Sequence, residues 1–151
     1  MNERLKALYK EVILQHSKEP FHFGKKEDCD HVIVANNPVC GDNYKFYVNA
    51  EKQTLKDVYF HGFGCAISKA SNAVLVQLIS DQDLKKAYAT CCAFLDYLDN
   101  RNNAPKTVTD PAFEAFSAVH EFPSRMDCAT LGSREVKKFL ENMKEVRYSA
   151  Q

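Results

Sequence analysis

Apolar side chains in the first part of the chain recur at the spacing of one helical face. Five of them occupy positions i, i+3, i+4, i+7 and i+8: Leu5, Leu8, Tyr9, Val12 and Ile13. This spacing is typical of an amphipathic helix that packs one side on a core. Pro20 lacks a backbone N–H and cannot continue such a helix. The pattern therefore predicts a helix that ends before Pro20.

A period of two replaces the helical period in three short runs: His31 to Ala35, Tyr44 to Asn49, and Thr54 to Phe60. In the middle run the side chains of Tyr44, Phe46 and Val48 alternate with Lys45 and Tyr47. Alternation of this kind indicates a strand with one buried face. The polar link over residues 50–53 is short enough for a hairpin. We therefore expect a small three-stranded antiparallel sheet.

Helical spacing returns after Gly64 and continues to the end of the chain. The expected helices carry three apolar faces: Ile67, Ala70, Val74 and Leu78; then Leu84, Ala87, Tyr88, Cys91, Leu95 and Leu98; and last Val136, Phe139, Leu140 and Met143. We expect Asp81 to be the N-cap of the second of these helices. The last helix is expected from about Cys128 to about Glu145, with its first turn loosened by Gly132.

Two further segments separate these helices. The stretch from Asp99 to Pro105 is rich in Asn and ends in Pro, which predicts a loop. The pair Asp110-Pro111 predicts the N-cap and first residue of a short helix that carries Phe113 and Phe116.

Length and charge narrow the classes of protein. A chain of 151 residues is most simply one domain, residues 1–151, with a core that needs no disulfides. Its 20 basic and 20 acidic side chains give a net charge of zero. No global field therefore attracts nucleic acid or an anionic membrane. No apolar run approaches the roughly 20 residues of a membrane span, and no signal peptide is evident. We expect a cytoplasmic protein.

Six cysteines are present, and the absence of a secretory signal favours free thiols or metal ligands over disulfides. Cys91 and Cys92 lie in or beside a helical apolar stripe and are expected to be small buried hydrophobes. Cys29 lies among acidic residues and is expected to be a surface or half-buried bystander.

The other three cysteines stand at turns or helix starts. Cys40 and Asp42 lie two residues apart in a turn that contains Pro38 and Gly41, which presents side chains rather than burying them. Cys65 follows Gly64 at an expected helix start, and Cys128 begins the last expected helix. Helix N-termini favour the thiolate, which is both a nucleophile and a metal ligand.

Three thiols and a carboxylate are the composition of a four-coordinate zinc site. The residues concerned are Cys40, Asp42, Cys65 and Cys128. Their spacing matches no compact zinc-finger motif, so the pattern fits a shared metal or redox site and buried structural thiols equally well. Arg125 lies near Cys128 and is either a solvated side chain or a contact for an anion or partner.

Four segments in the same order resemble the IscU/SufU family of iron–sulfur assembly proteins: Leu8 to Ile13 with His16, Pro20 and Gly24; Asn36 to Asp42; Gly64 to Ser71; and Phe122 to Leu131. The long segment between Cys65 and Cys128 is similar to the SufU branch. The resemblance implies an α+β fold, with helices packed on a small three-stranded antiparallel sheet.

The resemblance also implies a function. Cys40, Asp42, Cys65 and Cys128 are implied to bind zinc. A cysteine desulfurase of the SufS type, which uses pyridoxal phosphate, is implied to pass persulfide sulfur to Cys40. A histidine of the desulfurase is implied to take the place of Cys40 at the metal. Four residues flank these positions in the matching motifs: Gly41, Lys69, Arg125 and Asp127.

The resemblance has two departures. Asp127 stands where the family typically has histidine or lysine, so it competes with Asp42 for the role of fourth ligand. Phe21-His22 stands where an Arg-Asn pair is usual, which changes the contacts available to partners.

The leading expectation is a zinc-dependent sulfur acceptor that hands sulfur to downstream iron–sulfur assembly proteins. One alternative is a scaffold for a transient [2Fe–2S] cluster, with iron as the metal. A structural zinc domain is a third reading, which the exposed turn around Cys40 disfavours.

Overall fold

The computed structural model describes residues 3–99, 116, 119 and 122–149. Helix α1 spans Glu3–Lys18 and ends before Pro20, as the apolar spacing predicted. Val12 and Ile13 are buried, and Leu8 and Tyr9 pack partly buried beside them. The side chain of Leu5 lies outside the described part of the chain. The amphipathic first helix is confirmed.

The sheet has four strands rather than the three expected. Its strands are β1 (His31–Asn37), β2 (Asp42–Glu51), β3 (Thr54–Phe63) and β4 (Gln82–Asp83), in the order β1-β2-β3-β4 and antiparallel throughout. The two-residue β4 arises because Asp81 adopts a left-handed conformation with φ 62°. Its N–H then donates to the Leu55 carbonyl at 2.7 Å, which places Gln82 beside β3.

The same turn corrects the expected N-cap. Helix α3 spans Leu84–Asp99, and its first turn is capped by Asp83, whose Oδ1 accepts the Lys86 N–H at 2.7 Å. Asp81 lies too early because its backbone is engaged in the turn toward β3. The helix thus has an aspartate as its N-cap, as expected, but two residues later than predicted.

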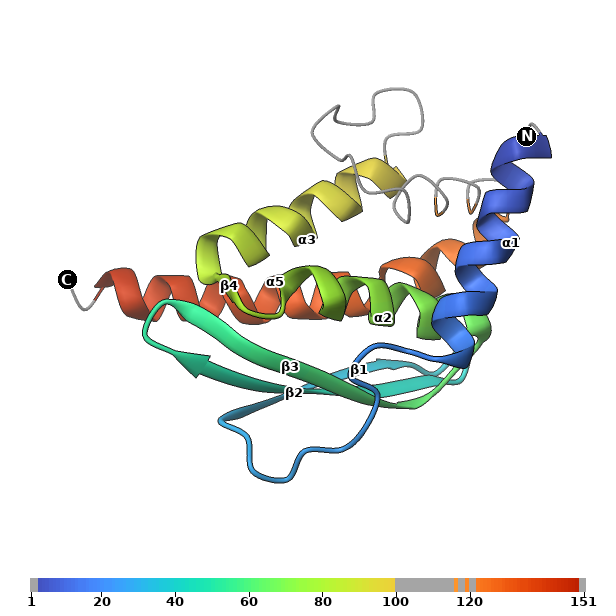
Figure 1. Cartoon of the computed structure of the whole chain (residues 1–151). Helices are drawn as coiled ribbons and strands as arrows, with labels where there is room; N and C mark the ends of the chain where they lie inside the picture. The colour runs from blue at the N-terminus through green and yellow to red at the C-terminus, as the bar shows by residue number, and fades with distance from the viewer. Residues whose placement is uncertain (1–2, 100–115, 117–118, 120–121, 150–151) are drawn as a thin grey trace.

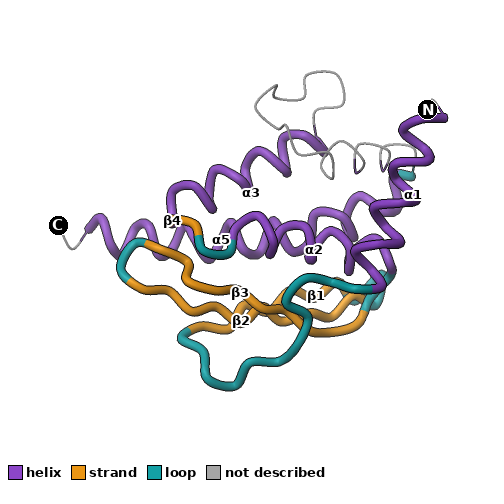
Figure 2. The backbone as a smooth tube through the Cα atoms, viewed as in Figure 1, coloured by secondary structure: helices purple, strands orange, loops and turns teal. Residues whose placement is uncertain are grey.

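Helices cover one face of the sheet (Figure 1). They are α2 (Ala66–Ile79), α3, and α5 (Met126–Ser149), which follows the short 3-10 turn η2 (Pro123–Arg125). Tyr44, Phe46 and Phe60 point from the sheet into the core, where they meet Leu75 and Leu140. Figure 2 shows the helices on one side of the strands and a loop on the other. The α+β fold class is confirmed.

The loop between α1 and β1 crosses the face of the sheet that the helices leave open. It starts at the β3 edge, where Phe23 bridges Phe60 and the Gly24 N–H donates to the Phe60 carbonyl at 2.8 Å. It ends at the other edge, where the Asp30 N–H donates to the Val48 carbonyl at 3.1 Å. The open face is therefore partly lined by loop residues.

The later segment is described only in part. Asp99, expected to begin a loop that runs to Pro105, is instead the last residue of α3. The rest of that loop, the expected helix start at Asp110-Pro111 and Phe113 lie outside the described residues. Phe116 is described and buried, with its ring edge-on to Phe94 at a centroid distance of 5.7 Å. Among the described helices, none combines the length and the apolar character that a membrane span requires.

Gly132 lets two helices approach closely instead of loosening α5, which begins at Met126 and runs through it without a break. A Cβ at this position would collide with the Asn72 side-chain amide oxygen on α2 and lie 2.9 Å from Cζ of Phe46. The expectation of a loosened first turn was wrong. It considered only the helix propensity of glycine, and the tertiary contact decides here.

We expect Gly132→Ala to destabilise the protein by about 1–3 kcal/mol. The steric cost of the added methyl between α2 and α5 exceeds the gain in helix propensity from glycine to alanine. Urea unfolding followed by circular dichroism measures the change. Asn142→Ala, on an exposed position of the same helix, is the control. An unchanged or higher midpoint for Gly132→Ala would show that the helices can separate without cost.

Candidate functional site

The β1–β2 turn places a cysteine and an aspartate in contrasting environments. Gly41 takes φ 76°, a left-handed conformation that glycine adopts without strain. The Val39 N–H donates to Asn37 Oδ1 at 3.2 Å and tightens the turn. Cys40 is exposed at the turn, whereas Asp42, the first residue of β2, is only 1% exposed. The turn thus offers an accessible thiol beside a buried carboxylate.

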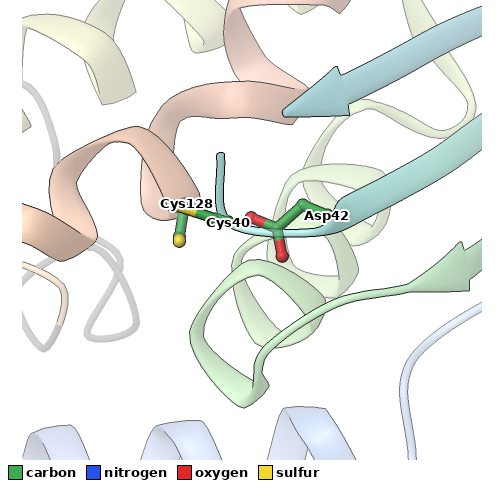
Figure 3. A group of neighbouring side chains, drawn as sticks. All are labelled: Cys40, Asp42 and Cys128. Carbon is green, nitrogen blue, oxygen red and sulfur yellow. The ribbon is translucent and has the colours of Figure 1, made fainter. Parts of the chain in front are cut away.

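Cys128 completes a close group with these two residues. One atom of each, the sulfurs of Cys40 and Cys128 and a carboxylate oxygen of Asp42, lies within 4.8 Å of the other two. Figure 3 shows the three side chains where the β1–β2 turn meets the first turn of α5. The start of α5 at Met126 puts Cys128 in that first turn. Two segments far apart in the sequence therefore meet at one point.

Cys65 lies beside this group and is joined to it through Asp42. It is the N-cap of α2, where its sulfur accepts the Ser68 N–H at 3.4 Å. Its own N–H donates to Asp42 Oδ1 at 3.2 Å. Its thiol is engaged by the start of the helix, and it is not a member of the close three-residue group. Of the four residues singled out from the sequence, three are gathered and the fourth is adjacent.

The two carboxylate oxygens of Asp42 have different surroundings. Oδ1 accepts the Cys65 N–H and also the Ser68 hydroxyl at 3.1 Å. The Ser68 hydroxyl lies 2.9 Å from the hydroxyl of Tyr44, and both side chains are buried. Oδ2 is buried and has no hydrogen-bond partner among the described residues. A buried oxygen of this kind is costly unless a ligand satisfies it.

The electrostatics of the group favour a cation. Burial raises the pKa of the Cys128 thiol above its ordinary value, and the nearby Asp42, Cys40 and Cys65 raise that pKa further. The pKa of the exposed Arg125 is also raised, first by its contact with Cys128. The raised pKa keeps the Cys128 thiol protonated beside the Asp42 carboxylate. A bound cation would favour the thiolate as it displaced the thiol proton.

Gly64, Ser68 and Tyr44 support Asp42, and the sequence patterns gave them no such role. A Cβ on Gly64 would lie 2.5 Å from both Asp42 Oδ1 and the Tyr44 hydroxyl oxygen, and 2.6 Å from the Ser68 hydroxyl oxygen. Burial, with a smaller effect of the charge on Asp42, raises the pKa of Tyr44 to about 12, so its hydroxyl stays protonated. The sequence signal available was the position of Ser68, three residues after the helix-capping Cys65.

Two of the site-adjacent residues lie outside the group. The Asp127 side chain is 69% exposed, and its Oδ1 lies 3.7 Å from a guanidinium nitrogen of Arg134. The Lys69 ammonium sits 4.5 Å from the centroid of the Phe23 ring. The structure therefore brings Asp42, and not Asp127, to the thiols.

The remaining singled-out residues are placed as follows. Phe21 stacks on His22 at a centroid distance of 3.9 Å, and His22 stacks on Tyr59 at 4.2 Å. Cys91 is buried, and burial raises its pKa to about 12, as befits an inert core thiol. Cys29 and Cys92 are half-buried.

Comparison with known proteins gives a consistent picture. The sequence profile of the NifU-like N-terminal domain matches residues 8–129. The zinc-dependent sulfurtransferase SufU of Bacillus subtilis strain 168 is 32% identical over 137 residues, which cover 91% of this chain and 92% of that protein. The iron–sulfur cluster assembly scaffold protein IscU of Streptococcus pyogenes serotype M1 is 30% identical over 135 residues, with coverage of 89% and 84%.

A solved structure agrees with these matches. A candidate iron–sulfur cluster assembly scaffold protein for the SUF system, from the thermophile Fervidobacterium islandicum, superposes with a TM-score of 0.78. It is 27% identical, and the match covers 87% of this chain and 95% of that one.

Proposed function

The chain belongs to the family of NifU-like N-terminal domains, together with SufU and IscU proteins of iron–sulfur cluster assembly, and from this premise we propose that it is a zinc-dependent sulfur acceptor. It takes persulfide sulfur onto Cys40 from a pyridoxal-phosphate-dependent cysteine desulfurase of the SufS type. It then passes the sulfur to downstream iron–sulfur assembly proteins.

The observation that carries the proposal is the contrast within the β1–β2 turn. Cys40 is exposed and can enter a partner's active site, while the adjacent Asp42 is buried with one unpartnered carboxylate oxygen. An accessible thiol next to a buried, unsatisfied carboxylate oxygen fits a metal site in which the thiol can dissociate from the metal while the carboxylate stays bound. A purely structural zinc site would have its ligands closed off from solvent.

The residues present fit a zinc ion. Cys40, Asp42 and Cys128 would hold it, with Cys65 as the fourth ligand. Bound zinc supplies the charge that keeps these thiols deprotonated while lowering their nucleophilicity. The hydrogen bonds that Cys65 and Ser68 donate fix Asp42 Oδ1, which leaves Oδ2 as the ligand atom.

The chemical step is a thiol–persulfide exchange. The Cys40 thiolate attacks the outer sulfur of the desulfurase persulfide, a new S–S bond forms on Cys40, and the old S–S bond breaks. The electron pair of the broken bond leaves with the partner's cysteine as a thiolate, so no oxidant or reductant is consumed. Arg125 is exposed next to Cys128, and its guanidinium attracts the anionic persulfide toward the turn.

A second candidate function rests on the same donor set. Three thiols and one carboxylate also suit a [2Fe–2S] cluster, and the Streptococcus relative is named as a scaffold protein. The two functions differ in what the protein carries when purified. The scaffold would hold iron and sulfide, and the sulfur acceptor would hold zinc.

Metal analysis of protein purified anaerobically without chelators tests the proposal. We expect about one zinc per chain, because the four ligands form a single site, and we expect no acid-labile sulfide. Asp42→Ala should lower zinc affinity roughly 10- to 100-fold in a chelator competition, and Asp127→Ala should not change it. Equal amounts of iron and sulfide would favour the scaffold. Equal affinity of Asp42→Ala and wild type would remove Asp42 from the site.

A further inference from the structure

The open face of the sheet carries a groove directly beside the candidate site. It has a volume of about 320 Å³ and lies between β2, β3 and the loop before β1. Lys45 and Tyr47 of β2, His61 and Phe63 of β3, and Lys25 of the loop line it. Asn43, which also lines the groove, follows Asp42 in the sequence, and Phe63 precedes Gly64 and Cys65. A molecule in the groove would therefore sit next to the β1–β2 turn.

The groove is basic and partly aromatic. Lys25 and Lys45 are exposed, and neither forms an ion pair with another described residue. None of the described residues that line the groove is acidic. The His61 ring lies between Phe23, at a centroid distance of 4.9 Å, and Phe63, at 6.4 Å, and Phe63 is 76% exposed. Such a lining offers charge and apolar contact to an acidic ligand.

The other end of the same face has the opposite character. A second hollow of about 320 Å³ is lined by Asp30, Glu51 and Asp57. Two lysines are already paired there: Lys56, which lines the hollow, lies 3.4 Å from Glu51, and Lys26 of the loop before β1 lies 3.2 Å from Asp57. The sheet surface therefore differs along its strands: Lys25 and Lys45, unpaired among the described residues, lie next to the candidate site, and at the far end three carboxylates outnumber two paired lysines.

We propose that this groove docks a short acidic segment of a partner protein, with carboxylates on Lys25 and Lys45 and an apolar side chain on Phe63. Lys45 and Asn49, which lines the acidic hollow, are four residues apart on β2, or about 13 Å at ~3.3 Å per residue. A segment of about four extended residues fills this length. A longer polyanion such as single-stranded nucleic acid would reach the far end, where the carboxylates of Asp30, Glu51 and Asp57 outnumber the two lysines and the net negative charge disfavours it.

This surface is separate from the metal chemistry. Its residues come from the outward-facing positions of β2 and β3, whereas Asp42 and Tyr44 point inward. The docking proposal can therefore be tested independently of whether the candidate site binds zinc. Docking of this kind would also orient the partner. A partner whose acidic segment binds the basic end, and whose basic residues face the acidic end, is aligned along the strands.

An NMR titration of the ¹⁵N-labelled full chain tests the proposal. The probes are a capped hexapeptide of alternating glutamate and phenylalanine, its counterpart with lysine in place of glutamate, and a short oligothymidylate. We expect saturable shifts of the Lys45, His61 and Phe63 amide signals with the acidic peptide only. Lys45→Glu should weaken binding about 10-fold or more. Lys56→Glu makes the same charge change at the acidic end and should not weaken it.

Three results would overturn the proposal. The first is an absence of saturable shifts in the groove with the acidic peptide. The second is equal weakening by Lys45→Glu and Lys56→Glu, which would indicate a response to net charge alone. The third is binding of oligothymidylate as tight as that of the acidic peptide, which would assign the surface to nucleic acid instead.

Discussion

Cys40→Ala is expected to reduce stimulation of a SufS-type cysteine desulfurase roughly 100-fold or more, because it removes the nucleophile that we propose accepts the sulfur. The thiol is exposed in a turn, so its loss leaves no cavity in the core and the fold should persist. Two measurements check this outcome: the rate of alanine formation by the desulfurase, and the mass increase of one sulfur atom on the peptide that contains residue 40.

Cys29→Ala is the matched control for this experiment. Cys29 is half-buried, and its thiol donates to the His31 carbonyl at 3.5 Å, at the opposite end of β1 from the Cys40 turn. Its loss should leave both readouts unchanged. If the desulfurase is stimulated equally by Cys40→Ala and wild type, the sulfur does not pass through Cys40. Retained zinc in Cys40→Ala with lost stimulation would separate sulfur transfer from metal binding.

Gly64→Ala is expected to have the second large effect, on zinc binding at the proposed metal site. The added methyl would lie 2.5 Å from Asp42 Oδ1 and from the Tyr44 hydroxyl oxygen, so the carboxylate must move. We expect zinc affinity to fall roughly 10- to 100-fold, as for other losses of support around a ligand. Unfolding free energy should fall by about 1–3 kcal/mol from overpacking. Chelator competition and urea unfolding measure the two effects.

Two variants make this result interpretable. Gly24→Ala places a methyl where no atom lies within 4 Å, so it controls for the change of residue type. Ser68→Ala removes the hydroxyl that donates to Asp42 Oδ1 without adding an atom. A lower zinc affinity in both Gly64→Ala and Ser68→Ala, with Gly24→Ala unchanged, would assign the effect to Asp42. Full zinc affinity in Gly64→Ala would mean that Asp42 does not need its observed position.

Local patterns predicted the elements but not their exact ends. The apolar spacing from Leu8 to Ile13 predicted α1 because a helical face is a property of neighbouring residues. The N-cap of α3 was placed at Asp81 instead of Asp83, since both aspartates precede the same apolar stripe. Only the pairing of Gln82 with Leu55, a residue distant in the sequence, makes Asp83 the cap and adds the fourth strand.

The choice between Asp42 and Asp127 as the candidate fourth ligand also depended on the tertiary structure. Both stand next to a glycine or a cysteine of the motifs, and the sequence left both as candidate ligands. Asp42 shares the parity of the buried Tyr44 and Phe46 on β2, so its side chain points into the protein. Asp127 falls on the outer face of α5, where it meets Arg134. Burial, which the strand and helix directions decide, separates the two.

The sequence by itself determined the class of fold, the family, and the thiols and carboxylate that deserve testing, because periodicity, turn residues and motifs are local features of the chain. Only the tertiary structure decided which of these residues meet. Cys40, Asp42 and Cys128 converge because α5 packs beside β1, whose turn into β2 carries Cys40 and Asp42, while Cys65 caps α2 beside them. The supporting contacts of Gly64, Ser68 and Gly132, and the basic groove on the open face, depend on strand register and helix packing. Those are set by contacts between distant segments, which no local pattern records.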